Sequence, residues 1–221
     1  MHYSISLNGI GNRINSFVVA RRKWPDALLW WPWYKGNHGI VPYFEELFEP
    51  RDFVVRTIGP RLYESVNIWN LMPVKMCDTS SITRNFENVS DDDKKEISDI
   101  VSLFKPADKL KPQITKIARK RGIHIRTWYD TSHSTPAQTV IKTLESMDLS
   151  DTYIACDNLV VQKWLYNNCF TALEPSLSPQ RSVVDLFSLA MCDELLLDKN
   201  STYSELALYL GGCKANVKFW Y

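Results

Sequence analysis

The chain has 221 residues, of which 45% are hydrophobic and 23% are charged, so it is long enough to fold as one large domain or two small ones. This composition excludes a disordered chain and a fibre. The 26 Lys and Arg residues and 25 Asp and Glu residues leave a net charge of +1. A charge so near zero argues against a nucleic-acid-binding protein that works by neutralising phosphates.

The cysteines and the N-terminus indicate the compartment. The five cysteines lie far apart without a CxxC pair, so we expect reduced, mostly buried thiols. The first residues lack the basic region and apolar run of a signal peptide, and no apolar stretch reaches the ~18–20 residues that span a bilayer. We therefore expect a cytoplasmic protein with no membrane span.

The first hundred residues predict short elements in irregular order. His2–Leu7 alternates like a strand, and Asn8–Arg13 reads as a glycine-bearing turn that opens a short helix ending near Lys23. Three further segments are strand candidates: Ala27–Trp31, Phe53–Thr57 and Ser65–Trp69. The cluster of Trp30, Trp31 and Trp33 fits either a hydrophobic core or a surface that stacks on sugar rings.

A helix start divides the chain. Ser90 is a typical N-cap, and Asp91–Asp93 place acids in the first turn, where the helix dipole favours them. We expect this helix to run to about Phe104 and to act as a hinge. It would separate an N-terminal half, residues 1–105, from a C-terminal domain, residues 106–221.

The second half alternates helices and strands regularly. The expected strands are Gly122–Tyr129, Thr152–Cys156, Phe170–Leu173, Glu194–Leu197 and Val217–Trp220. The expected helices are about Pro112–Arg121, one opened by Thr135-Pro136, Leu159–Asn167, one through Val183 to Ala190, and about Thr202–Leu210. This alternation predicts a parallel sheet covered on both faces, with a ligand site at the carboxyl ends of its strands.

The strand after residue 121 carries the first candidate site. Ile123 and Ile125 alternate with His124 and Arg126, so both polar side chains share one face near the strand's end. Arg126 could hold a diphosphate through two parallel hydrogen bonds. The alternative is a structural ion pair between Arg126 and a carboxylate such as Asp130.

Two further segments could approach an anion. Asp198–Ser204 lies between a strand and a helix, where Ser201 or Thr202 caps the helix, and the alternative is an ordinary N-cap. The glycines of Asn8–Arg13 allow close backbone approach, but the dinucleotide fingerprint is incomplete, which argues against a dehydrogenase. The four histidines have no metal-ligand spacing, so we expect no metal site and no cofactor.

Taken in order, these segments resemble the fucosyltransferase superfamily with the GT-B arrangement, which contains the α1,6-fucosyltransferases and protein O-fucosyltransferases. The resemblance rests on Gly9–Arg13, His124–Arg126, Tyr153–Asp157, Val184–Asp193, Ser201–Ser204 and Gly211-Gly212. It implies an α/β, GT-B-like fold, in which a C-terminal Rossmann-like domain faces a smaller, irregular N-terminal half.

The resemblance also implies the chemistry, which is inverting, metal-independent transfer from a GDP-sugar, fucose being favoured, to a glycan or other hydroxyl acceptor. Arg126 would hold the β-phosphate and stabilise the departing GDP, while His124 and Asp185 would contact the guanine or ribose. The remaining members of the implied binding set are Gly11, Asn12, Arg13, Asp157, Ser201, Thr202 and Ser204. Ser201, Thr202 and Ser204 would contact the phosphates.

The general base is left open by the sequence. Asp130 is one candidate, whereas Asn12 and Arg13 could act only by polarising or orienting a group. The chain is shorter than typical members of the superfamily, so its acceptor half is reduced. A non-catalytic nucleotide-sugar-binding or scaffold protein is therefore the alternative function.

Overall fold

The computed structural model describes residues 2–6, 9–36, 39–55, 86–117, 120–127, 135–169, 173–198 and 201–220. Its α-helices are α1 (Ile10–Lys23), α2 (Asp91–Val101), α3 (Lys111–Ile117), α4 (Ala137–Glu145), α5 (Leu159–Asn168), α6 (Pro179–Ala190) and α7 (Thr202–Leu210). The strands are β1 (Tyr3–Ile5), β2 (Leu28–Trp30), β3 (Tyr34–Gly36), β4 (Gly39–Val41), β5 (Val54–Val55), β6 (Arg121–Ile125), β7 (Thr152–Cys156), β8 (Glu194–Asp198) and β9 (Asn216–Trp220). Short 3₁₀ turns lie at Phe44–Glu46, Phe86–Asn88 and Asp108–Leu110.

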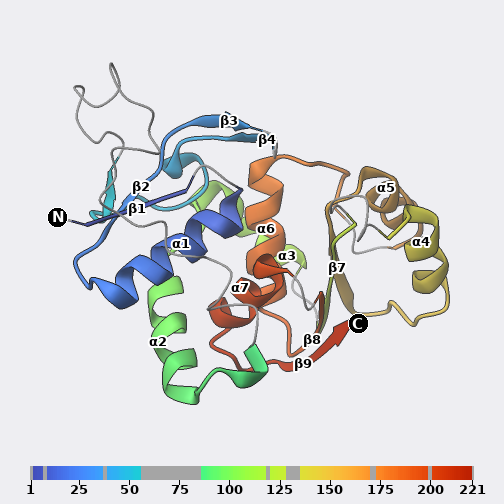
Figure 1. Cartoon of the computed structure of the whole chain (residues 1–221). Coiled ribbons are helices and arrows are strands. Elements are labelled where there is room, and N and C mark those ends of the chain that lie inside the picture. Colours follow the sequence, from blue (N-terminus) through green and yellow to red (C-terminus); the bar gives the residue numbers. More distant parts are fainter. Residues whose placement is uncertain are drawn as a thin grey trace.

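A four-stranded parallel sheet in the order β7-β6-β8-β9 forms the centre of the C-terminal half. The chain goes from β6 to one neighbour, β7, and then returns to the other side of β6 at β8. Helices α4 and α5 cover one face of this sheet, and α6 and α7 cover the other (Figure 1). The predicted parallel α/β arrangement is therefore confirmed, and its topological switch point lies beside β6.

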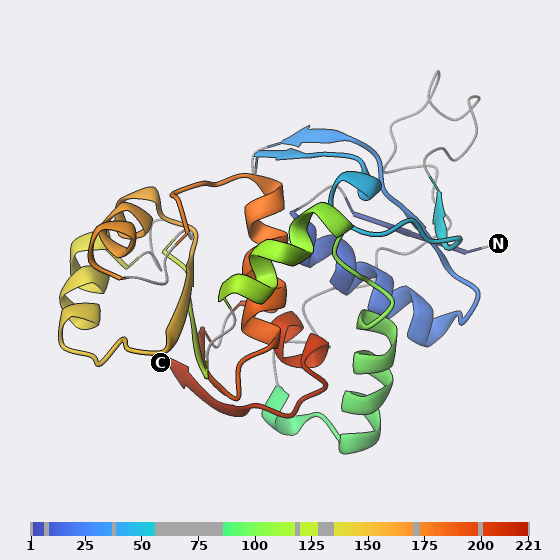
Figure 2. The ribbon, with the colours of Figure 1, turned by 180° about the vertical axis from the view of Figure 1, so that it is seen from behind.

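The N-terminal half is built on a smaller parallel sheet, with the order β1-β2-β5. Helix α1 connects β1 to β2, and an antiparallel hairpin of β3 and β4 follows. Seen from behind, α3 crosses α6, and α2 (green) stands at the lower right of the molecule (Figure 2). The sequence predicted β1, β2 and β5 without their order, so the small βαβ unit is a finding of the structure, as is the hairpin of β3 and β4.

One hydrophobic core runs through both halves. It joins α1 residues such as Ile14 and Phe17 to Leu186 of α6 and Leu206 of α7. A second, smaller cluster lies between the other face of the sheet and helices α4 and α5. The boundary predicted at residues 105 and 106 stays a prediction, and the main core crosses it.

Several predicted boundaries shift. Helix α1 begins at Ile10 with Gly9 as its N-cap, so the predicted turn at Asn8–Arg13 is wrong for residues 10–13, which form the first helical turn. Strand β6 ends at Ile125, and α2 ends at Val101. The strand predicted at Ser65–Trp69 lies outside the described residues, as do residues 170–172 of the strand predicted at Phe170–Leu173.

The tryptophan cluster divides between the core and the surface. Trp30 and Trp31 are buried, and the Trp31 indole Nε1 donates a hydrogen bond to the Pro42 carbonyl at 3.0 Å. Trp31 also packs edge-to-face against Phe44 and Phe48. Trp33 is 48% exposed. The core interpretation therefore holds for the first two tryptophans.

Candidate active site

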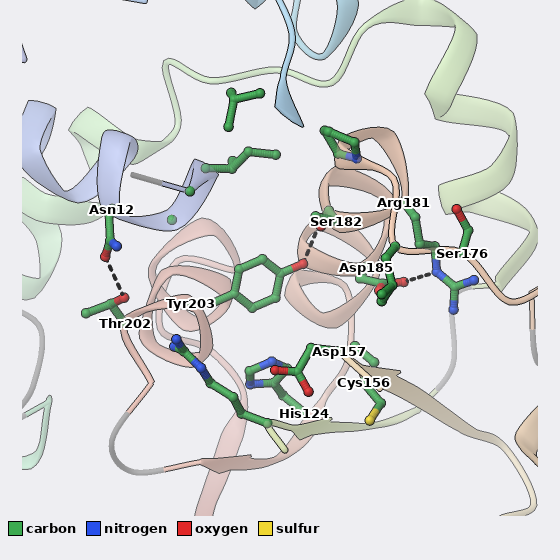
Figure 3. Close-up of a pocket in the computed structure, with 18 of the residues that line it drawn as sticks. Asn12, His124, Cys156, Asp157, Ser176, Arg181, Ser182, Asp185, Thr202 and Tyr203 are labelled. Carbon is green, nitrogen blue, oxygen red and sulfur yellow. Dashed lines mark hydrogen bonds and ion pairs between the residues drawn. The ribbon is translucent and has the colours of Figure 1, made fainter. Parts of the chain in front are cut away.

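A cavity of about 410 Å³ lies at the carboxyl ends of β6 and β7, next to the switch point of the sheet (Figure 3). The first turn of α1 and strand β4 close it from the N-terminal half, and α6 and α7 close it from the C-terminal half. Its volume is in the range of small-molecule sites. Its polar lining residues include Asn12, His124, Arg126, Asp157, Gln162, Ser176, Arg181, Ser182, Asp185, Thr202 and Tyr203.

Strand β6 brings His124 and Arg126 to the cavity, Arg126 being the first residue after the strand. His124 is buried, and its Nδ1 lies 2.6 Å from the Ser204 hydroxyl oxygen. Burial, together with the nearby Arg126 guanidinium, lowers the pKa of His124 to about 3. The imidazole is therefore neutral near pH 7, and Arg126 is the group on this strand end that brings positive charge to the cavity.

Helix α6 contributes a buried ion pair. Arg181 Nε donates to Asp185 Oδ1 at 2.6 Å, and the Tyr153 hydroxyl of β7 donates to the same oxygen. Burial raises the pKa of the Asp185 carboxyl, although the Arg181 guanidinium acts in the opposite direction. The pKa of Tyr153 is raised well above its ordinary value by burial and by Asp185, so Tyr153 keeps its proton and remains a donor.

Helix α7 meets α1 at the cavity. The Thr202 hydroxyl donates to Asn12 Oδ1 across 3.4 Å, which links the two halves of the chain (Figure 3). Ser201 is the N-cap of α7, because its side chain accepts a hydrogen bond from the Ser204 backbone N–H at 3.4 Å. The Tyr203 hydroxyl donates to the Ser182 carbonyl, and its ring lies 5.0 Å from that of His124.

Two side chains from the end of β7 complete the wall. Asp157 Oδ1 accepts hydrogen bonds from the Thr127 backbone N–H at 2.8 Å and from the Thr127 hydroxyl at 2.9 Å. Asp157 thereby fixes the backbone that follows Arg126. Burial raises the pKa of the neighbouring Cys156 thiol to about 12, so this cysteine stays protonated and is a poor nucleophile near pH 7.

The first turns of three helices reach the cavity. Gly11 and Asn12 lie in the first turn of α1, Pro179 and Arg181 in that of α6, and Thr202 in that of α7. Backbone N–H groups at a helix N-terminus lack intrahelical partners, and the helix dipole favours negative charge there. Together with Arg126, these helix ends make the cavity suitable for an anion.

Most of the residues predicted from the sequence lie together. Seven line the cavity: Gly11, Asn12, His124, Arg126, Asp157, Asp185 and Thr202. Ser204 lies behind His124, and Ser201 has the capping role that the sequence left as the alternative. Asp130 lies outside the described residues. The binding and catalytic roles assigned to these residues stay predictions.

Arg13 has a different environment from the one expected of a ligand-binding residue. It is fully buried and does not line the cavity. Its Nη1 donates to the Pro32 carbonyl at 2.9 Å, and its guanidinium lies over the Trp31 ring at 4.9 Å. Arg13 therefore packs beneath the cavity wall, between α1 and the segment that follows β2.

Sequence reasoning missed Arg181 and Tyr203. Arg181 comes three residues after the N-cap Ser178, and Ser178-Pro179 is a typical helix start, so the first turn of α6 could have been located. Its spacing of four residues from Asp185 also favours an ion pair. Nothing in the local pattern indicates that this turn borders a cavity.

A metal site was not expected, and the described residues contain no group of three or more His, Cys, Asp and Glu side chains that could hold a metal ion. Metal independence stays a prediction. In the same part of the chain, no helix is both long enough and apolar enough to cross a membrane.

The fold is that of solved fucosyltransferases. The fucosyltransferase NodZ from Bradyrhizobium matches with a TM-score of 0.51 at 13% identity, over 93% of this chain and 91% of that chain. POFUT1 in complex with GDP-fucose matches with a TM-score of 0.51 at 12% identity, over 99% of this chain and 97% of that chain. Arabidopsis thaliana FUT1, a variant in complex with GDP, matches with a TM-score of 0.57 at 13% identity, over 99% of this chain and 69% of that chain.

The structural likeness confirms the predicted GT-B-like fold and the resemblance to fucosyltransferases at the level of the fold. No protein-family model matches the sequence. No curated protein matches it either.

Proposed function

We propose that this chain is a glycosyltransferase that binds a GDP-sugar in the cavity and transfers the sugar, with inversion, to a glycan or another hydroxyl acceptor. The observation that carries the proposal is the cavity itself. It combines Arg126 with three helix N-termini at the carboxyl ends of a parallel sheet. GDP-fucose is the proposed donor because NodZ and POFUT1 were solved with GDP-fucose and share the fold.

In this proposal, Arg126 binds the β-phosphate. Negative charge moves onto that phosphate as the glycosidic bond breaks, so a fixed guanidinium stabilises the transition state more than the ground state. The helix N-termini add the positive end of the helix dipole. Together these groups would neutralise the diphosphate without a metal ion or any other cofactor.

The described acids at the cavity bear on the choice of a general base. Of the described residues that line the cavity, Asp157 and Asp185 are the carboxylates, and each accepts hydrogen bonds from protein groups. Asn12 also lines the cavity, but an amide can orient an acceptor hydroxyl without removing its proton. We propose Asp130, the candidate four residues after Arg126 in the sequence, as the base.

The same observation favours a second function, a non-catalytic nucleotide-sugar-binding protein. Both described carboxylates at the cavity have structural partners, and the cavity needs no base in order to bind a nucleotide sugar. Both kinds of protein would bind the nucleotide sugar, but only the catalytic one would turn it over. An assay that measures both separates them.

The experiment measures the binding of GDP-fucose to the purified protein and the release of GDP from it, with and without a panel of glycan acceptors. We expect release in the presence of EDTA, faster with a suitable acceptor and strongly reduced in Asp130→Asn. Binding without release by the wild type, with or without acceptor, would favour the non-catalytic function. Absence of binding would contradict both. Release that EDTA abolishes and Mn²⁺ restores would contradict the metal-free mechanism.

A further inference from the structure

Residues 173–178, which we call the strap, form part of the cavity wall between α5 and α6. Ser176 and Leu177 of the strap line the cavity, and Figure 3 shows Ser176 on the segment that leads into α6. Leu177 is 57% exposed, so packing of its side chain does little to hold the strap in place. The strap belongs to no helix or strand, so its buried backbone N–H and C=O groups need other partners.

Gln162 of α5 binds the strap and the sheet at the same time. Its side chain carries an amide and is nevertheless only 3% exposed. Its Oε1 accepts a hydrogen bond from the Ser176 backbone N–H at 2.7 Å, and its Nε2 donates to the Cys156 carbonyl at 2.6 Å. Because Cys156 is the last residue of β7, Gln162 ties the strap to the carboxyl end of the parallel sheet.

Two other hydrogen bonds of the strap have a different direction. Arg181 Nη1 donates to the Glu174 carbonyl at 2.9 Å, and the Ser178 backbone N–H donates to the Ser176 hydroxyl at 3.1 Å. These bonds connect the strap to α6 and to itself, whereas the bonds of Gln162 connect it to β7. The distance between the strap and the sheet therefore depends on Gln162.

From this geometry we infer that Gln162 is a positioning residue, which holds the strap at the distance from β7 that the bound nucleotide sugar requires. The inference rests on the proposed binding of a GDP-sugar. Both ends of the Gln162 amide bind protein groups, so Gln162 acts on the ligand through Ser176 and Leu177. A wall that is already fixed need not be ordered when the ligand arrives, which raises affinity. The chemical step depends instead on Arg126.

The test uses Gln162→Met, which keeps a similar volume but can form neither hydrogen bond. Calorimetry measures the dissociation constants of GDP and GDP-fucose, and hydrogen exchange measures the protection of the strap amides. We expect both ligands to bind about tenfold more weakly or worse, and the strap amides to exchange faster in the free protein. Where the wild type turns over GDP-fucose, KM should rise in the variant and kcat should stay within about twofold.

Ser188→Ala is the matched control for the loss of a buried polar group. The Ser188 hydroxyl is fully buried and donates to the Val184 carbonyl at 2.7 Å within α6, and Ser188 does not line the cavity. This variant should have a lower melting temperature, with dissociation constants and strap exchange like those of the wild type.

Gln162→Glu is a second test of the same two hydrogen bonds. In its neutral form, the new carboxyl group can accept from the Ser176 N–H and donate to the Cys156 carbonyl, whereas its charged form has no donor. Burial favours the neutral form. The dissociation constant for GDP, divided by that of the wild type at the same pH, should therefore fall toward one as the pH is lowered from about 8 to about 5. The ratio removes the effect of Asp157 and Asp185, the described carboxylates that line the cavity in both proteins.

The possible results bear on different claims. Unchanged GDP affinity in folded Gln162→Met would overturn the inference and leave the proposed function intact. Weaker binding with unchanged strap exchange would mean that Gln162 contacts the ligand itself, which also overturns the inference. A kcat that falls while KM stays the same, or an affinity ratio of Gln162→Glu that does not change with pH, would do so as well. A wild type that binds neither GDP nor GDP-fucose overturns the proposed function, and the inference with it.

Discussion

The two halves of the chain contribute different chemistry to the cavity. From the C-terminal half come the charged side chains, Arg126 after β6 and the Arg181–Asp185 pair on α6. The N-terminal half contributes the first turn of α1 and apolar contacts from Ile40 and Val41. Arg13 directly follows the lining residue Asn12 in the chain, but its side chain packs against Trp31 instead of facing the cavity.

This contrast indicates where substitutions should change chemistry and where they should change packing. Side chains of the parallel sheet and its helices point into the cavity, so their loss should reduce binding or turnover. The first turn of α1 reaches the cavity partly through glycine, so its side chains matter less there.

Arg126→Ala should lower turnover per folded molecule by ~10²-fold or more, because it removes a fixed charge that stabilises the leaving phosphate. Lysine should rescue it only partly, since it lacks the planar fork. Arg121→Ala is the matched control from the opposite end of β6, where Arg121 Nη2 donates to the Asp148 and Ser150 carbonyls. If Arg126→Ala lowers the melting temperature but leaves the rate of its folded fraction unchanged, Arg126 is structural.

Acidification should reveal the burial of His124. Its pKa is about 3 in the folded chain and near 6.5 when unfolded, so between these values the unfolded chain takes up a proton that the folded chain refuses. The free energy of unfolding should therefore fall as the pH drops through this window, by about 1.4 kcal/mol per pH unit from this site. Urea unfolding of the wild type and His124→Asn at several pH values measures the difference in slope. Equal slopes would contradict the assignment.

Gly122→Ala should lower the free energy of unfolding by about 1–3 kcal/mol, the usual range for overpacking a core. A Cβ atom at Gly122 would lie 2.8 Å from Leu195 Cδ2, 2.9 Å from Cys192 Sγ and 3.1 Å from Leu189 Cδ2. All three neighbours are buried, so they have little room to move. Urea titration measures the change, and an unaltered midpoint and slope would show that this part of the core can relax.

Gly11→Ala should have the smallest effect. A Cβ atom there would meet Leu206 and Tyr203 of α7 at 3.7 Å, which is ordinary contact. Alanine also favours the helix, by up to ~1 kcal/mol relative to glycine. We expect slightly higher stability and GDP affinity within about twofold of the wild type, since the added methyl group packs toward α7. A large loss of GDP affinity would show that the added methyl group obstructs the ligand instead of packing toward α7.

The sequence could predict the features that local patterns determine, but not those that depend on contacts between distant segments. The helix Thr202–Leu210 is predicted correctly, with Ser201 as one of two candidate N-caps, because an N-cap and a periodic apolar face are local signals. The order of strands β1, β2 and β5 depends on pairing between distant segments, which short strands do not specify. The burial of Arg13 depends on Trp31 from the segment that follows β2, and the position of Arg181 depends on how α6 crosses the sheet. Tertiary contacts of this kind leave no periodic pattern.

The most direct test of the central claim is calorimetric titration of the wild-type chain with GDP-fucose, GDP and UDP in the presence of EDTA. The proposed site predicts metal-free binding of GDP-fucose and GDP, and much weaker binding of UDP. At about 100 times the dissociation constant, either guanine ligand should raise the free energy of unfolding by ~2.7 kcal/mol. The same titration with Arg126→Ala should show weaker binding of both. Equal affinity for UDP, or no binding without a metal ion, would contradict the account.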